Sequence, residues 1–165
     1  MLTAFEELPD SSRVWVYGVD RQIDGPVESL LLAEVDNYLT TWAAHGVPLH
    51  AARKWDGRFL TVAVDQSRAG ASGCSIDGLF RALKSLEQNI GAGLVTSGLV
   101  FFRAKDGAIR SVTRDEFTEL GARGEVTGDT EVFDPSVTSL GEWRARFSSH
   151  ASDSWHGSLL HTRAG

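Results

Sequence analysis

The feature that most constrains the fold is a six-residue run of almost entirely apolar side chains, Phe59-Leu-Thr-Val-Ala-Val64. A strand with this composition is typically buried on both faces, so we expect it at the centre of a sheet. The residues before it, Pro48 to Trp55, predict a partner strand, and Asp56-Gly57 between the two favours a type I′ hairpin turn. The sequence therefore predicts a hairpin whose second strand is central.

Two amphipathic helices are predicted, one before and one after this hairpin. The first has Asp24 as N-cap and Pro26 in its first turn, and it ends at Gly46. Its apolar residues recur at steps of three and four, at Val27, Leu31, Val35, Tyr38 and Trp42. The second helix carries the apolar stripe Ile76, Leu79, Phe80, Leu83, Leu86 and Ile90. Each helix thus has one face suited to cover a sheet.

Two further strands complete the pattern. Arg13 to Val19 precedes the first helix and Leu99 to Phe102 follows the second, and both are rich in β-forming residues. The order β-α-β-β-α-β is that of a ferredoxin-like sandwich, an antiparallel sheet with two helices on one face. We therefore expect an α+β fold with a ferredoxin-like core at residues 1–98.

A small extension at 99–150 and a tail at 151–165 are predicted after this core. Asp106-Gly107 predicts a hairpin turn, and Glu131 to Phe133 a short strand. Capping boxes at Thr113–Glu116 and Ser139–Glu142 predict two short helices. We expect the last ten residues to be frayed.

The extension carries a series of aromatic, glycine and capping positions. They are Phe101-Phe102, Lys105-Asp-Gly107, Thr113-Arg-Asp-Glu-Phe117, Leu120, Gly124, Val126, Thr130-Glu-Val-Phe133 and Trp143. This series resembles the bacterial GYF-like domain, which implies a β-hairpin and helix scaffold and, for the family, binding of proline-rich peptides. Arg110-Ser111 stands where that pattern has Gly-Pro, so the resemblance implies the scaffold and not the peptide-binding role.

A second resemblance covers nearly the whole chain. It rests on Ser12-Arg-Val-Trp-Val-Tyr17, Trp42-Ala-Ala-His45, Arg58-Phe59, Val64-Asp65, Ser72-Gly-Cys-Ser-Ile-Asp77, Leu86-Glu87 and Asp153-Ser-Trp-His156. These segments resemble a family of small bacterial proteins that often carry the label ABC-transporter ATPase. A P-loop needs Gly-Lys-Ser/Thr to cradle phosphates, and no lysine here follows a glycine. We therefore expect no ATPase activity.

Composition excludes several classes of function. The chain has 165 residues, 42% of them apolar, and a net charge of −6, which disfavours binding to duplex nucleic acid. The single cysteine, Cys74, excludes an internal disulfide and a four-cysteine zinc site. No apolar run approaches the ~20 residues of a membrane helix. The acidic first ten residues, with no basic segment, predict that there is no signal peptide, so we expect a cytoplasmic protein.

The most chemically suggestive stretch is Gly73-Cys74-Ser75-Ile76-Asp77. If Ser75 caps the second helix, Cys74 lies just before a helix amino end, where the dipole and free amides stabilise a thiolate or bind an anion. Gly73 would allow a ligand close to the backbone, whereas Asp77 would repel a negative charge. The simpler alternative is that Ser75 and Asp77 cap the helix and Cys74 is a buried packing residue.

A cysteine nucleophile needs a base, and three histidines are candidates. They are His45 at the end of the first helix, His50 on a strand, and His156 in the tail, where Trp155-His156 could fold back toward Cys74. These side chains match no spacing of a known metal site, so we expect neither a metal nor another cofactor. The carboxylates Asp65 and Asp77 could serve as a general acid and base, and the simpler explanation is that Asp65 ends a strand and Asp77 caps a helix.

One face of the first strand carries Arg13, Trp15 and Tyr17. Aromatic residues and arginine dominate binding hot spots, so this row, with Arg58 nearby in the hairpin, predicts a recognition surface. The alternative is that the extension or the tail covers it. Stacking of single-stranded bases on the aromatic side chains is disfavoured by the negative net charge.

The leading hypothesis is a non-catalytic protein that binds a protein partner or a small anionic ligand. Its candidate binding residues are Arg13, Trp15, Tyr17, Arg58, Gly73, Ser75, Asp77 and Trp155. The alternative is a thiol-dependent enzyme or redox sensor that uses Cys74 with His156 or His45 as base. Exposed strand edges in a small sheet are compatible with a homodimer.

Overall fold

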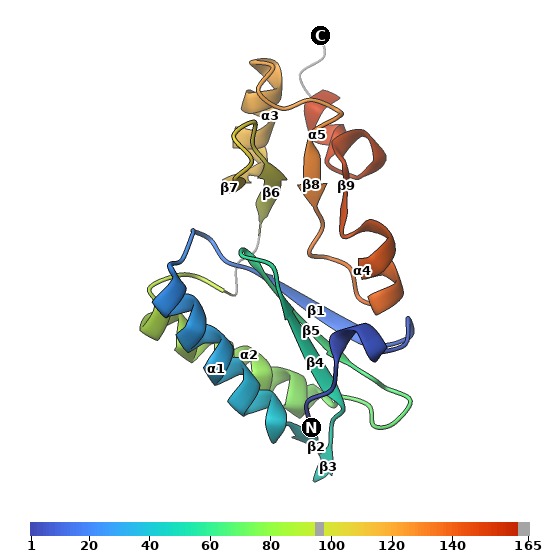
Figure 1. Ribbon diagram of the computed structural model, residues 1–165. Helices are drawn as coiled ribbons and strands as arrows, with labels where there is room; N and C mark the ends of the chain where they lie inside the picture. The colour runs from blue at the N-terminus through green and yellow to red at the C-terminus, as the bar shows by residue number, and fades with distance from the viewer. Residues whose placement is uncertain (95–97, 162–165) are drawn as a thin grey trace. The chain divides into compact units, whose positions relative to one another are not determined.

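The computed structural model describes residues 1–94 and 98–161, and the chain has the α+β fold that the sequence predicts (Figure 1). It forms two compact units. The first comprises Met1–Thr96 and Pro135–Arg144, and the second comprises Ser97–Asp134 and Ala145–Gly165. The segment 135–144, which the sequence placed in the extension, thus lies with the first unit.

The first unit is built on a three-stranded antiparallel sheet in the order β1-β5-β4. The strands are β1 (Arg13–Gly18), β4 (Ala51–Trp55) and β5 (Phe59–Val64). All six residues of β5 are buried, which confirms the prediction of a central strand. The turn before it was predicted as type I′, which needs positive φ at both central residues, but Gly57 alone among residues 56–58 has positive φ.

Two long helices, α1 (Gly25–Thr40) and α2 (Gly73–Ile90), lie on one face of this sheet (Figure 1). Asp24 caps α1 as predicted, because its carboxylate accepts a hydrogen bond from the amide of Val27 at 2.9 Å. The core between the layers includes Leu31, Val35 and Leu39 of α1, Leu79, Leu83, Leu86 and Ile90 of α2, and Leu60, Val62 and Val64 of β5.

The end of α1 differs from the prediction. The helix stops at Thr40, and residues 43–48 form a small hairpin of β2 (Ala43–Ala44) and β3 (Val47–Pro48). His45 and Gly46 form its turn with φ of 52° and 80°. Glycine readily adopts left-handed backbone both at the end of a helix and in a type I′ turn. Gly46 is therefore compatible with the predicted helix end and with the hairpin turn that is formed.

The predicted fourth strand does not join the first sheet. It forms β6 (Leu99–Arg103), which pairs in the second unit with β7 (Ile109–Thr113) and β8 (Glu131–Phe133). The last strand of that sheet is β9 (Ser148–His150). Among the described residues, the first sheet therefore has three strands, and the four-stranded ferredoxin-like sheet is not formed.

The second unit also contains α3 (Arg114–Ala122), a 3-10 helix at Ala151–Asp153 and α5 (Gly157–His161). The capping box of Thr113 and Glu116 is present as predicted. Leu159 and Leu160 pack against a core that includes Phe102 and Phe117. Gly157–His161 is therefore helical where fraying was predicted, because its apolar residues complete this small core. The last four residues of the predicted frayed segment, 162–165, lie outside the described residues.

The segment 135–144 returns beside β1. The amide of Val14 donates to the carbonyl of Thr138 at 3.0 Å, and the amide of Leu140 donates to the carbonyl of Ser12 at 2.8 Å. Helix α4 (Leu140–Arg146) follows, begun by the predicted cap in which the Ser139 hydroxyl accepts from the Glu142 amide. Among residues 1–94 and 98–161, no helix combines the length and apolar character needed to cross a bilayer.

Candidate functional site

The amino end of α2 is set by a pair of serines. Ser72 is the N-cap, and its hydroxyl accepts a hydrogen bond from the amide of Ser75 at 3.1 Å, while the Ser75 hydroxyl accepts from the amide of Ser72 at 2.8 Å. The predicted cap, Ser75, is therefore the third residue of the helix and is buried. Cys74 lies inside the first turn instead of before it, and its side chain is exposed.

A pocket of about 380 Å³ opens at this helix end, and we call it the amino-end pocket. Its lining residues are Tyr38, Thr41, Trp42, Ala43, His45, Ser72, Cys74 and Ser75. The tight turn of the β2–β3 hairpin places His45 there, and the indole nitrogen of Trp42 anchors the wall by donating to the carbonyl of Ser75 at 2.9 Å. The structure thus brings together two predicted partners, Cys74 and His45.

The electrostatics of this pocket favour a negatively charged group. Among the described residues, the amides of Gly73 and Cys74 make no hydrogen bond, because Ser72 uses its hydroxyl for Ser75 and its carbonyl for Ile76. These amides lie at the positive end of the helix dipole. Asp77, predicted to oppose an anion here, pairs with Arg81 at 3.4 Å, so its charge is partly balanced.

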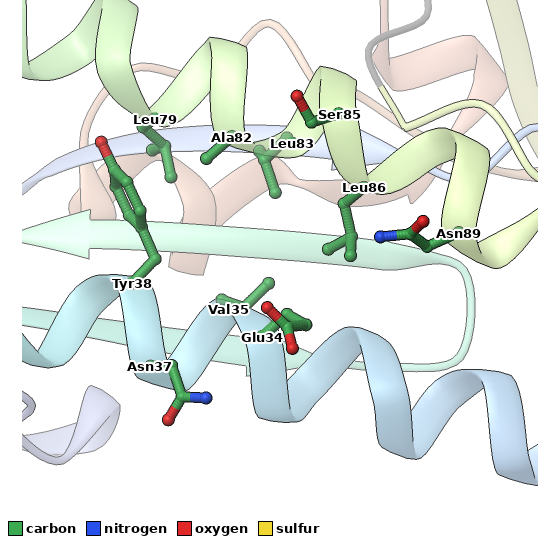
Figure 2. A pocket seen from close by; sticks show the side chains of 10 residues that line it. All are labelled: Glu34, Val35, Asn37, Tyr38, Leu79, Ala82, Leu83, Ser85, Leu86 and Asn89. Atoms are coloured by element: carbon green, nitrogen blue, oxygen red, sulfur yellow. The ribbon is translucent and has the colours of Figure 1, made fainter.

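A groove of about 340 Å³, which we call the interhelical groove, runs between α1 and α2. Figure 2 shows Tyr38 and Val35 on α1 and Leu79, Leu83 and Leu86 on α2 around the space between the helices. Polar side chains also line it, namely Glu34, Asn37, Ser85 and Asn89. The groove therefore combines an apolar floor with a polar rim.

Tyr38 lines both hollows and joins them. A Cβ added to Gly78 would lie 2.7 Å from the Tyr38 hydroxyl oxygen, so glycine leaves the space that this hydroxyl occupies. Burial raises the pKa of Tyr38, and the charge of Arg81 opposes that rise. The sequence indicated Tyr38 only as part of an apolar stripe; its role here depends on Gly78, a contact between two helices that no local pattern reveals.

His156 and Trp155 lie in the second unit, whereas Cys74 lies in the first. The His156 ring is fully buried, stacked on Trp155 at 3.8 Å between centroids, with Nδ1 2.6 Å from the hydroxyl oxygen of Ser154. Burial lowers the pKa of His156 from 6.5 to about 4, against the opposing charge of Asp134. His156 is thus packed among side chains of its own unit.

The predicted row on β1 is packed against the helix layer. Trp15 meets Trp42 edge to face with centroids 5.9 Å apart, and burial raises the pKa of Tyr17 to about 12. The guanidinium of Arg13 lies 4.9 Å from the centre of the Trp15 ring. Arg58 is buried, and its guanidinium donates two hydrogen bonds to the carbonyl of Val19. Trp15 and Tyr17 therefore belong mainly to the core, and Arg58 ties the hairpin to the end of β1.

In comparisons with known proteins, no family model, curated protein or solved structure matches the chain. The resemblances to GYF-like domains and to the small bacterial family, with the roles they imply, stay predictions. Within the described parts of the chain, no three side chains of His, Cys, Asp or Glu gather as metal ligands would.

Proposed function

We propose that the protein is a non-catalytic binding protein for a small, elongated ligand with an apolar body and an anionic head. The body would lie in the interhelical groove and the head in the amino-end pocket. The observation that carries this proposal is that Tyr38 lines both hollows, so that an apolar floor leads to the first turn of α2.

The interhelical groove suits an apolar body. Val35, Leu79 and Leu83 form its floor and are already held in place by the core, so ligand binding would need little rearrangement. Each apolar carbon buried there stabilises the complex by about 0.8 kcal/mol. The polar rim, including Asn37 and Asn89, would fix the orientation of the ligand.

The amino-end pocket suits an anionic head. The amides of Gly73 and Cys74 and the hydroxyl of Thr41 offer hydrogen-bond donors, and the helix dipole favours negative charge. His45, in the turn of the β2–β3 hairpin, also lines the pocket, and its ring N–H adds a further donor. A carboxylate or a sulfonate has the charge and the acceptor atoms that these groups require.

The test uses anilinonaphthalene sulfonate, a fluorescent probe with an apolar body and an anionic head. We expect saturable fluorescence with the wild-type protein. The variant Ala82→Phe places a ring in the groove and should lower the affinity about tenfold or more. The matched control Lys84→Ala, exposed on the same helix and outside both hollows, should leave it unchanged.

Equal affinity of the Ala82→Phe variant and the wild type, with both folded by circular dichroism, would exclude the groove as the binding site. Loss of binding in the Lys84→Ala control would point to a general surface effect. In either case the proposal would fail.

A second candidate function is thiol chemistry, favoured by one observation: the exposed Cys74 and His45 line the same pocket. A base in that pocket would increase the reaction rate of the sulfur. In the His45→Gln variant we expect alkylation of Cys74 by iodoacetamide to slow about tenfold or more. His150→Gln, a substitution of an exposed histidine in the second unit, is the control. Equal rates in all three proteins would mean that Cys74 is merely accessible.

A further inference from the structure

The interhelical groove has two different ends. At one end Tyr38 of α1 lies opposite Leu79 of α2, and at the other Asn89 lies beyond Leu86 (Figure 2). Tyr38 also lines the amino-end pocket, so the first end leads to the first turn of α2. The groove therefore has a direction, from the first turn of α2 toward its last turn.

Charge determines which way round a ligand lies in this groove. The amides of Gly73 and Cys74 offer hydrogen-bond donors at the first end. Glu34 is the only charged side chain among the described residues that line the groove, and it lies on the Asn89 side of Tyr38 (Figure 2). An anionic head is therefore attracted to the first turn of α2 and repelled from the groove, so the apolar end of the ligand points toward Asn89.

The length of this path follows from the geometry of α2. From position 74, at the head, to position 86, the last apolar residue of α2 that lines the groove, the helix rises about 18 Å at about 1.5 Å per residue. An extended alkyl chain advances roughly 1.25 Å per carbon, because its C–C bonds of ~1.52 Å are staggered. The path therefore matches an alkyl chain of about fourteen carbons.

We propose that the ligand is a long-chain fatty acid, with its carboxylate at the first turn of α2 and its methyl end at Leu86, and that the groove selects the length of the chain. This inference rests on the ligand site proposed above and adds the chemical class of the ligand. A single unbranched chain suits a groove with apolar side chains on its floor and polar side chains on its rim.

The far end of the groove limits the length. Ser85 and Asn89 of α2 are exposed there, and Glu34 of α1 adds a charge to the rim. A longer chain would carry its last carbons past the apolar floor into water, where they add nothing to binding. The affinity should therefore rise with chain length up to about fourteen carbons and then stay level.

The test is a calorimetric titration of the full-length protein with the even-numbered alkanoates from octanoate to octadecanoate, each kept below the concentration at which it forms micelles. Because the groove lies at the surface, it covers one side of the chain, and we expect the affinity to rise about twofold per added carbon up to tetradecanoate. From tetradecanoate to octadecanoate the affinity should change by less than about twofold in total.

On the protein side, Ser85→Phe places a ring across the groove just before Leu86. It should weaken binding of tetradecanoate about fourfold, to the level of dodecanoate, and leave binding of octanoate unchanged. The matched control Gln88→Phe adds the same ring at an exposed position of α2 that does not line the groove, and should change neither. Because the alkanoate series does not alter the protein, it tests the proposal even if Ser85→Phe disturbs folding.

The outcomes separate a failure of this inference from a failure of the proposed function. If alkanoates bind with an affinity that does not depend on chain length, or that keeps rising to octadecanoate, the ligand site stands and the selection of length is wrong. If no alkanoate binds, both proposals fail together. Co-sedimentation of the protein with phosphatidylglycerol vesicles, in that case, would make a membrane lipid the occupant instead of a free fatty acid.

Discussion

At the scale of single residues, the hydroxyl of Tyr38 occupies the space that Gly78 leaves by having no side chain. Alanine at position 78 would gain up to about 1 kcal/mol of helix stability over glycine, but its Cβ would meet the Tyr38 hydroxyl oxygen at 2.7 Å. We therefore expect Gly78→Ala to increase the free energy of unfolding clearly in a Tyr38→Phe background and little in the wild-type protein. Urea unfolding of the four proteins measures this coupling, and equal effects in both backgrounds would show that the two residues do not interact.

His156 is the residue whose protonation should change stability. Its pKa is about 4 when folded and 6.5 when free, because burial penalises the imidazolium. The unfolded chain therefore binds a proton at higher pH than the folded protein does. The contribution of His156 to the free energy of unfolding is fully present above pH 6.5 and is lost progressively as the pH falls toward 4.

This pH dependence is measured by urea unfolding across that range. We expect His156→Leu to flatten the curve, while His150→Gln, at an exposed site in the same unit, should keep its slope. If the wild type and His156→Leu lost stability in parallel on acidification, then protonation of His156 would not be the cause.

At the scale of elements, the start of α2 depends on the reciprocal bonds of Ser72 and Ser75. Removing the cap with Ser72→Ala should lower the free energy of unfolding by about 1 kcal/mol, since an amide in the first turn loses its acceptor. Ser85→Ala, at an exposed position within the same helix, should be neutral or slightly stabilising. A Ser72→Ala loss no larger than that of Ser85→Ala, by thermal unfolding, would contradict the assigned cap.

Elements defined by local patterns were predictable from the sequence. The all-apolar β5, the cap at Asp24 and the box at Thr113–Glu116 each depend on residues a few positions apart, and all are present. The strand at Leu99 and its hairpin with β7 through Asp106-Gly107 were predictable as well. Its place beside β8 in the second sheet was not, because that pairing depends on residues far apart in the sequence. The N-cap of α2 was predicted at Ser75 and lies at Ser72. Either serine suits an N-cap, and the reciprocal hydrogen bonds between them determine which one takes that position.

The candidate site was predictable from the sequence only where it depends on local patterns. Cys74 was recognised from its place at a predicted helix start, and His45 from its residue type alone. Their meeting in one pocket depends on the β2–β3 hairpin, where the sequence had predicted helix. The contribution of Tyr38 depends on packing against Gly78, two residues that lie 40 positions apart in the sequence.

At the scale of the whole molecule, the chain crosses between its two units, since 135–144 belongs to the first and the residues on both sides of it to the second. Phe117 is fully buried in the second unit, with Phe102 and His156 against its ring. Phe117→Ala should destabilise that unit by about 3–5 kcal/mol. Hydrogen exchange measured residue by residue should show the loss in β6 and β8 and little change in β5. Equal loss in both units would mean that they unfold as one.

The most direct test of the proposed function is a titration of the protein with decanoate and with decanol, followed by two-dimensional amide NMR. Both molecules have the same apolar chain, but only decanoate has an anionic head. The proposal predicts that both shift the amide signals of Leu83 and Leu86 and that only decanoate shifts those of Gly73 and Cys74. Equal shifts at Gly73 and Cys74 with both molecules, or shifts confined to residues outside the two hollows, would contradict it.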